Sequence, residues 1–478
     1  MPSSPTASLQ VLSSLKTLEL YGGSSIVLPS VEGVSHAEYE FPVECVTIGR
    51  WNASAKELTQ LLTYFPELSE LNMRSCDQIT GLAVVEKRTA ETPAPESSDN
   101  NKVDDQQQDG TRGEEEIATS SAEGLLLLPS QLQTLRILYC RKLSLCSNSI
   151  DHNRESGRPG GGQGLQGLCF LRSLQIIYCP RFLCSYSSSS SSSWFPFPTS
   201  LERLCLLGAV GTATPLPLSN LASLTDLTIW ECGDLRGEGL RHLLAQGRLT
   251  ILSVRGTPNF WAGPEPPLPH EQEFSSSSSK LQKLETDDVA GVLAAPICTL
   301  LSSSLTELTF HDDKEVERFT KEQEDALQLL TSLEITFWDC DKLQCLPAGL
   351  HGLPNLKKLN IYSCPTIRSL PKDGLPSSLQ VLVIDDCPAI QSLPKDCLPT
   401  SLQKLEIHSC PAIRSLPKDG LPISLQKLEI DDCPNIRSLP KVNDLPSSLR
   451  ELNVQRSKSE ELRRQCRKLI GIIPVVYA

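Results

Sequence analysis

Cysteine is the residue type in this sequence with the greatest capacity for chemistry, and 18 of the 478 residues are cysteines. Such a number could indicate disulfides or zinc ligands, but the Cys-x-x-Cys spacing of zinc ribbons and thioredoxin-like motifs is absent. Instead, Cys364, Cys387, Cys410 and Cys433 recur every 23 residues. A fixed period indicates a structural position. We therefore expect these thiols and that of Cys340 to be buried, reduced and unreactive.

Three other patterns have plainer interpretations than catalysis or ligand binding. Ser-x-x-Lys, a spacing used by some serine acyl-enzymes, recurs at the same period without Ser-Asp-Asn or Lys-Thr-Gly, so it is one repeated loop. Its copies are Ser369/Lys372, Ser392/Lys395, Ser415/Lys418 and Ser438/Lys441. The glycine-rich stretch 160–164 lacks the Lys-Ser/Thr of a phosphate-binding loop, and the seven histidines form no ligand-spaced pair. We expect no catalytic residue, no cofactor, no metal and no enzymatic activity.

Each of the periodic cysteines ends the phrase Leu-x-x-Leu-x-Ile-x-x-Cys, and we call this last position the ladder slot. Clear copies with cysteine start at Leu68, Leu132, Leu171, Leu224, Leu356, Leu379, Leu402 and Leu425. A copy at Leu449 has Ser457 in the ladder slot, and weaker copies start at Leu15, Val43, Leu201, Leu249, Leu281 and Leu305. The copy Leu333-Ile335-Phe337-Cys340 fits only if one residue is deleted. The phrase thus occurs 16 times, and nine of the cysteines occupy its ladder slot.

This phrase resembles the leucine-rich repeat, whose consensus is Leu-x-x-Leu-x-Leu-x-x-Asn/Cys-x-Leu. The alternation Leu-x-Ile independently predicts a short strand whose apolar side chains face inward. Stacked parallel strands would form a continuous core, so we expect an α/β leucine-rich-repeat solenoid, or horseshoe, with a concave parallel sheet. The convex side should be irregular in the proline-rich last third, with short helices elsewhere, such as one over 239–246.

The spacing of the copies suggests five segments. We expect N-terminal repeats over 1–85, a disordered acidic insertion over 86–124, and irregular repeats with Gly-, Ser- and Pro-rich inserts over 125–330. Regular 23-residue repeats should cover 331–456, followed by a capping helix and tail over 457–478. Ser457 and Glu460 have the spacing of a capping box, and Leu462, Cys466 and Leu469 share one helical face. Nothing comparable covers the first repeat, so we expect the chain to be the distal part of a longer protein.

The overall charge argues against several partners. The chain has 44 Lys+Arg and 57 Asp+Glu, a net charge of −13, which disfavours nucleic-acid binding. Between Glu86 and Glu123, 11 acidic and 4 basic residues give −7. We find no secretory signal, no apolar run long enough to span a membrane, and one glycosylation sequon at Asn52. We expect a cytoplasmic protein without a membrane span.

The particular residues of the repeats resemble those of a narrower group of proteins. IRSLPKDGLPSSLQVLVIDDCPAI, LTSLEITFWDCDKLQCLPAGLHGLPNLKKL and the tail CRKLIGIIPVVYA resemble the C-terminal repeats of plant nucleotide-binding leucine-rich-repeat disease resistance proteins, particularly the coiled-coil type of cereals. The resemblance implies an intracellular immune receptor whose repeats restrain a nucleotide-binding switch and help to sense pathogen effectors. No phosphate loop, switch domain or coiled coil occurs in this sequence, so only the recognition and regulatory role carries over.

The residues on either side of each inner Leu-x-Ile should face outward, where a partner could bind. Equivalent residues on neighbouring strands form columns about 4.8 Å apart. One column should contain Trp338, Tyr362, Asp385, His408, Asp431 and Gln455. Aromatic anchors beside charges suit protein recognition. The candidate contact residues are Trp230, Trp338, Tyr362, Asp385, His408, Asp431, Lys358, Lys404 and Lys427.

The function we expect is a non-enzymatic protein-recognition and regulatory module of an intracellular plant immune receptor. Its partners would be a pathogen effector or guarded host protein and a nucleotide-binding switch domain in cis or trans. One alternative is a leucine-rich-repeat adaptor such as an F-box substrate receptor, and a second is a receptor remnant without independent activity. An extracellular or membrane receptor is disfavoured by the absent signal and the unpaired cysteines.

Overall fold

The repeated phrase forms short strands whose leucine and isoleucine side chains point into the core. In β16 (Lys358–Tyr362), Leu359 and Ile361 are completely buried. Each strand alone would leave this apolar edge open, so stability depends on neighbouring coils covering one another. The computed structural model describes residues 15–22, 41–84, 124–145, 165–183, 195–210, 215–263, 279–393, 398–417 and 420–478.

Two compact units divide the chain, the first covering 1–201 and the second 202–478. In the first unit, successive strands of the main sheet pair in parallel in the order in which they occur along the chain. They are β1 (Thr17–Tyr21), β2 (Cys45–Gly49), β3 (Glu70–Arg74), β6 (Thr134–Leu138) and β7 (Ser173–Ile177). A separate parallel pair is formed by β4 (Gly81–Val84) and β5 (Leu125–Leu128), beside helix α2 (Ala55–Leu62).

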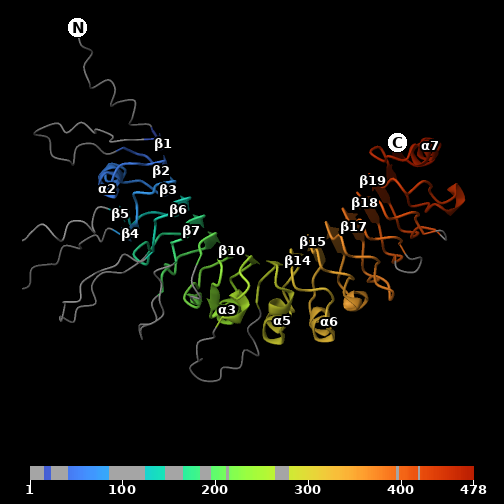
Figure 1. The fold of residues 1–478 in the computed structure, drawn as a ribbon, viewed down its shortest axis with the longest axis horizontal. Helices are drawn as coiled ribbons and strands as arrows, with labels where there is room; N and C mark the ends of the chain where they lie inside the picture. The colour runs from blue at the N-terminus through green and yellow to red at the C-terminus, as the bar shows by residue number, and fades with distance from the viewer. Residues whose placement is uncertain are drawn as a thin grey trace, which may run out of the picture. The chain divides into compact units, whose positions relative to one another are not determined.

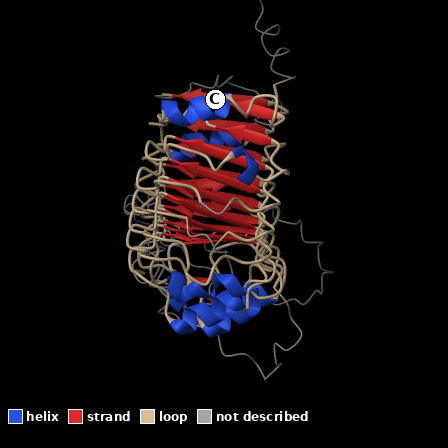
Figure 2. Ribbon diagram, turned by 90° about the vertical axis from the view of Figure 1, so that its right-hand side faces the viewer, coloured by secondary structure: helices blue, strands red, loops and turns tan. Residues whose placement is uncertain are grey.

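The second unit has a longer parallel sheet that also follows the order of the sequence (Figures 1 and 2). Its strands are β8 (Arg203–Leu207), β10 (Asp226–Trp230), β12 (Ile251–Arg255), β13 (Lys283–Thr286), β14 (Glu307–His311), β15 (Glu334–Trp338), β16, β17 (Val381–Asp385), β18 (Lys404–His408), β19 (Lys427–Asp431), β20 (Glu451–Asn453) and β21 (Val475–Tyr477). The parallel leucine-rich-repeat solenoid predicted from the phrase is therefore the fold of this chain.

The backs of the coils in the second unit carry short helices and 3₁₀ turns away from the sheet (Figure 1). The helices are α3 (Leu240–Ala245), α4 (Val289–Val292), α5 (Ala295–Leu301), α6 (Lys321–Gln328) and α7 (Glu460–Arg467). The 3₁₀ turns are η2 (Phe260–Ala262), η3 (Ala348–Gly352) and η4 (Val442–Asp444), and β9 (Pro215–Pro217) pairs with β11 (Arg236–Glu238). The prediction of a short helix over 239–246 is confirmed by α3. The proline-rich backs between α6 and α7 contain only 3₁₀ turns within the part of the chain described.

Most described coils turn sharply where their strands end. In eleven of them the residue before the ladder slot is not glycine and has a left-handed backbone, with φ between 45° and 57°, whereas Asp288 at this position has φ of −123°. In this conformation, the N–H group points along the sheet: Ser363 donates to the carbonyl of Asp385 (2.9 Å), and Asp386 donates to that of His408 (3.1 Å). The turn directs the following ladder-slot side chain into the core.

The ladder slot is buried in each described coil, and its nine cysteines are free thiols with at most 3% exposure. Cys340, Cys364, Cys387, Cys410 and Cys433 are among them. The Cys387 Sγ atom lies 3.7 Å from the Ile361 carbonyl oxygen in the preceding coil and 3.3 Å from that of Asp385. Thiols are weak donors, so these contacts align the backbone only modestly.

One ladder slot holds a carboxylate instead. Asp313 is 5% exposed, and its two oxygens accept from the backbone N–H groups of Val289, Glu315 and Val316, each at 2.9 Å. A buried charge satisfied by three donors replaces the weak thiol contact, and it joins two neighbouring coils. This role could not be predicted, because Asp313 stands in the ladder slot of a weak copy of the phrase that starts at Leu305.

The expected deletion in the copy at Leu333 is wrong. The pairing of Ile335 with Leu308 and Leu359 shows that the phrase keeps its normal spacing if Ser332 occupies the first leucine position. Ser332 is 2% exposed, whereas Leu333 is 38% exposed and faces outward. The sequence favoured Leu333 for the first leucine position because its side chain is apolar, whereas that of Ser332 is polar.

The C-terminal segment also differs in detail from its prediction. A helix forms, and Leu462, Cys466 and Leu469 are buried on one face, but its N-cap is Ser459, whose hydroxyl accepts from the N–H of Leu462 (3.3 Å). The capping box proposed for Ser457 is therefore wrong: the Ser457 hydroxyl accepts from the N–H of Ser459 (3.2 Å). After α7, the tail pairs in parallel with β20 as an additional strand, β21, which the leucine pattern did not reveal.

Candidate functional site

The register of the second unit aligns the last outward residue of each strand from β14 to β19 into one column. The paired positions, in order, are His311, Trp338, Tyr362, Asp385, His408 and Asp431. The column arises because the inner positions of each of these strands carry two buried apolar residues, which fix the phase of the others. His311 belongs to this column, although the sequence analysis did not place it there.

Three rings lie side by side at one end of this column. His311 and Trp338 stack with centroids 5.8 Å apart and planes 7° apart, and Trp338 and Tyr362 lie 5.0 Å apart at 46°. Trp338 remains 43% exposed. Burial, and secondarily the charge of Arg255, hold the pKa of His311 below its usual value, which favours the neutral ring. We call His311, Trp338 and Tyr362 the aromatic run.

The other end of the column alternates acid, imidazole and acid. The His408 Nδ1 atom lies 3.8 Å from an Asp385 carboxylate oxygen, and its Nε2 atom lies 3.9 Å from one of Glu429. The side chain of Asp431 is on the next strand and lies 3.8 Å from the guanidinium of Arg456. Half-buried charged groups of this kind can discriminate among partners by charge.

The candidate lysines are already engaged within the sheet face. Lys358 contacts Glu334 at 2.8 Å, and Lys404 contacts Glu406 at 2.9 Å. Lys427 lies within 3.5 Å of three carboxylates, those of Glu406, Glu429 and Glu451. Burial opposes the charge of Lys427, but the hydrogen bonds to its carboxylates outweigh it and raise its pKa. These lysines shape the surface rather than offering free cations.

Trp230 is separate from this group. It occupies the same outward position on β10, with β12, β13 and β14 between it and Trp338, a separation of roughly 19 Å at the usual strand spacing. Its indole N–H donates to the Ser253 hydroxyl (2.8 Å), and the Arg255 guanidinium covers its ring at 4.4 Å. The structure therefore brings together the other candidate residues but not Trp230.

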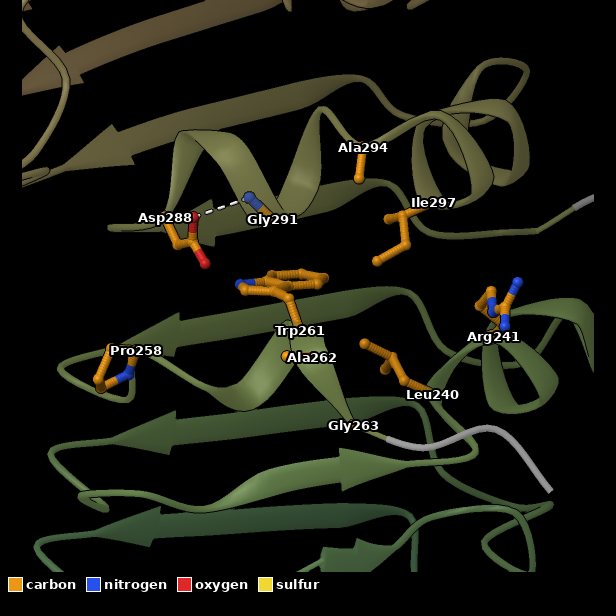
Figure 3. Close-up of a pocket in the computed structure, with 10 residues that line it drawn as sticks. All are labelled: Leu240, Arg241, Pro258, Trp261, Ala262, Gly263, Asp288, Gly291, Ala294 and Ile297. Carbon is orange, nitrogen blue, oxygen red and sulfur yellow. Dashed lines mark hydrogen bonds between the residues drawn. The ribbon is translucent and has the colours of Figure 1, made fainter. Parts of the chain in front are cut away.

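A cavity of about 320 Å³ lies on another side of the second unit, between η2, α3, α4 and α5 (Figure 3). The indole of Trp261 occupies its centre, and the Asp288 carboxylate accepts from the N–H of Gly291 (2.7 Å). Apart from Arg241 and Asp288, the lining side chains are apolar. Because this lining lacks a convergent set of polar groups, the sheet face is the stronger candidate.

Within the described residues, the patterns considered for catalysis gather no reactive set. Ser369 and Lys372 lie on exposed loop positions, whereas Lys395, Lys418 and the stretch 160–164 fall outside the described residues. Among the residues that the structure describes, no three His, Cys, Asp or Glu side chains could hold a metal ion. Within the same residues, no helix has both the length and the apolar character to cross a bilayer.

No protein-family model and no curated protein matches this sequence. Among solved structures, the chain is similar to the leucine-rich-repeat domain of the type III effector XopL, with 22% identity and a TM-score of 0.27 over 37% of this chain and 68% of that one. It is also similar to a leucine-rich-repeat protein of Leptospira interrogans, with 16% identity and a TM-score of 0.40 over 99% and 98% of the two chains. The chain's own coils define its fold as a leucine-rich-repeat solenoid.

Proposed function

We propose that this chain is a non-enzymatic module that binds a protein partner through the sheet face of its second unit. The observation that carries the proposal is the aromatic run, which leaves Trp338 43% exposed beside an ordered row of acids and imidazole. Large rings held rigid by their neighbours lose little freedom on binding, and adjacent charges discriminate among partners. Recognition is thus assigned to the regular repeats over 331–456, together with His311.

The biological setting we propose is intracellular plant immunity. The repeat sequence around Leu375–Ile390 and the tail at 466–478 support this setting, because both resemble the sequences of cereal disease resistance proteins. In that setting, the partner is a pathogen effector or a guarded host protein in the cytoplasm. A nucleotide-binding switch domain, in cis or in trans, would be regulated through the same repeats.

The decisive experiment combines partner binding with a cellular readout. The chain would be co-expressed in leaves with the nucleotide-binding module of a cereal coiled-coil receptor and candidate effectors, and cell death and co-precipitation measured. We expect Trp338→Ala plus Tyr362→Ala to reduce effector co-precipitation at least ten-fold, since truncating a hot-spot aromatic costs about 2 kcal/mol or more. A matched control is Ile423→Ala, which removes an apolar side chain that is 77% exposed away from the sheet face.

The outcomes separate the candidate functions. Unchanged co-precipitation by the double variant, with an unchanged melting temperature, would remove the aromatic run from the interface. Specific capture of a ubiquitin-ligase adaptor instead of a switch domain would favour the adaptor function. Absence of any response in every effector combination would favour a receptor remnant.

A further inference from the structure

The first unit carries an independent surface feature where its strands end. Exposed cations gather on the strand-end turns of neighbouring coils, although the whole chain is strongly acidic. They are Arg50, Arg74, Arg141, Lys142 and Arg181. None of the five is ion-paired to a described carboxylate, in contrast to the engaged lysines of the second unit. We call these cations, with Tyr139 and Tyr178, the strand-end patch.

The backbone brings these residues onto consecutive coils. The N–H of Arg50 donates to the Arg74 carbonyl (2.8 Å), and the N–H of Tyr139 donates to the Ile177 carbonyl (2.8 Å). Arg74 pairs with Leu138 in the register of β3 and β6. The strand-end turns of β2, β3, β6 and β7 therefore follow one another along a single edge of the first unit.

Two tyrosines form the apolar part of the patch. Tyr139 and Tyr178 stack with centroids 5.5 Å apart and planes 16° apart, and they are 40% and 41% exposed. The Arg74 guanidinium lies 5.5 Å from the centre of the Tyr139 ring. Both tyrosines adopt the left-handed conformation, with φ of 57° and 52°. This is the turn conformation that most other coils share, and it places both rings at the surface where the strands end.

The unpaired cations point to a carboxylate-bearing ligand. Asp77, on the coil of Arg74, is engaged because its side chain accepts from the backbone N–H of Arg141 (3.1 Å). A long polyphosphate would extend beyond the patch and meet a chain with a net charge of −13. A short acidic peptide interacts mainly with charges within about 10 Å, because salt screens those farther away. Its binding therefore depends on the cations of the strand-end patch rather than on the net charge of the chain.

The length of the patch defines the ligand further. Four strands at about 4.8 Å spacing span roughly 14 Å, which an extended peptide covers with four or five residues. Carboxylates at alternate positions would then lie about 7 Å apart on one side of the peptide. We propose that the strand-end patch binds an extended acidic segment of a protein partner, with Arg74 and Arg141 pairing with its carboxylates and the two tyrosines packing against its backbone.

A direct binding assay on the full chain tests this proposal. The probe is a rhodamine-labelled Gly-Glu-Ala-Glu-Ala-Glu-Gly peptide, compared with its Gln counterpart, by fluorescence anisotropy. We expect the Glu peptide alone to bind, and its affinity to fall as salt is raised. Arg74→Gln plus Arg141→Gln should weaken binding about five-fold, because exposed ion pairs are individually weak. Tyr178→Ala should also weaken binding.

Matched controls keep the result interpretable. Lys372→Gln plus Arg437→Gln removes two exposed cations from the second unit and should leave the affinity unchanged. Circular dichroism melts should show that all variants remain folded. The proposal is overturned by equal binding of the Gln peptide, by unchanged affinity in Arg74→Gln plus Arg141→Gln, or by no binding at about 1 mM peptide.

Two other occupants of the patch are outcomes of the same assay. A labelled oligothymidine that binds more tightly than the peptide would assign the patch to nucleic acid. The chain's own acidic insertion is tested by Glu114→Gln, Glu115→Gln and Glu116→Gln together. A higher peptide affinity in that variant would mean that the chain's own carboxylates compete for the patch. That result would overturn the proposal that the patch binds a separate partner.

Discussion

Individual residues at equivalent positions of the coils are interchangeable only when their polar groups are satisfied. At the ladder slot, the Cys387 thiol approaches two carbonyls weakly, whereas the Asp313 carboxylate accepts three backbone N–H groups. Ser332 contrasts with both, because its hydroxyl is buried without a hydrogen-bond partner at a position that other coils fill with leucine. Polar residues in a solenoid core thus differ greatly in their contribution to stability.

Ser332→Ala should therefore raise the free energy of unfolding by about 1 kcal/mol, since it removes an unsatisfied buried hydroxyl with little change in volume. Urea denaturation followed by circular dichroism would measure the change. The matched control is Ser378→Ala, whose hydroxyl donates to the Leu356 carbonyl (2.8 Å) and whose loss should lower stability by about the same amount. A clear loss of stability in Ser332→Ala would mean that the hydroxyl has a partner in solution.

The candidate site was partly predictable at this scale. The two-residue alternation sufficed to predict that Trp338, Tyr362 and Asp385 face outward on adjacent strands. The alternation could not predict that Lys427 lies within reach of three carboxylates or that Arg255 covers Trp230, because side-chain rotamers across coils decide such contacts. His311 was missed as part of the aromatic run because it lies in the weak copy of the phrase that starts at Leu305.

At the scale of elements, the last coil shows how a helix and a strand substitute for a leucine-rich phrase. The helix α7 covers the back of this coil with Leu462 and Cys466, and β21 adds to the sheet beside β20. The sequence predicted α7 from its periodic apolar face. It did not predict β21, because Ile473 and Val476 stand where the phrase expects leucines and Pro474 lies between them.

The corrected N-cap of α7 provides a test of this element. Ser459→Ala should destabilise α7 by about 1 kcal/mol, because its hydroxyl accepts from the N–H of Leu462. Hydrogen exchange measured by mass spectrometry should show faster exchange in residues 460–468 of the variant. Lys458→Ala, which removes a side chain that is 70% exposed, should leave this exchange nearly unchanged. Equal protection in Ser459→Ala and the unmodified chain would contradict the assignment.

For the whole molecule, burial of the ladder thiols makes chemical modification a measure of coil opening. Burial raises the pKa of the Cys232 thiol to about 12, so both access and the thiolate fraction are low in the folded chain. Only opening of the stacked coils would expose such a thiol to solvent. Cys169, by contrast, is exposed.

We therefore expect N-ethylmaleimide to modify Cys169 rapidly under native conditions, while Cys387 and Cys410 react only at urea concentrations that unfold the chain. Peptide mass spectrometry of timed samples would measure both rates. Fast native modification of Cys387 and Cys410, or a disulfide between them, would be incompatible with the stacked coils described above.

The constant register of the regular coils has a consequence for how this surface changes over generations. Because β16 to β19 share one phase and successive ladder cysteines are 23 residues apart, unequal recombination that gains or loses one such unit preserves the inside and outside of every other unit. All downstream outward residues simply move one strand along the sheet. Asp385 would then neighbour Asp431 instead of His408 if the unit carrying β18 were lost, so a population could acquire a new binding specificity in a single genetic event without redesigning the core.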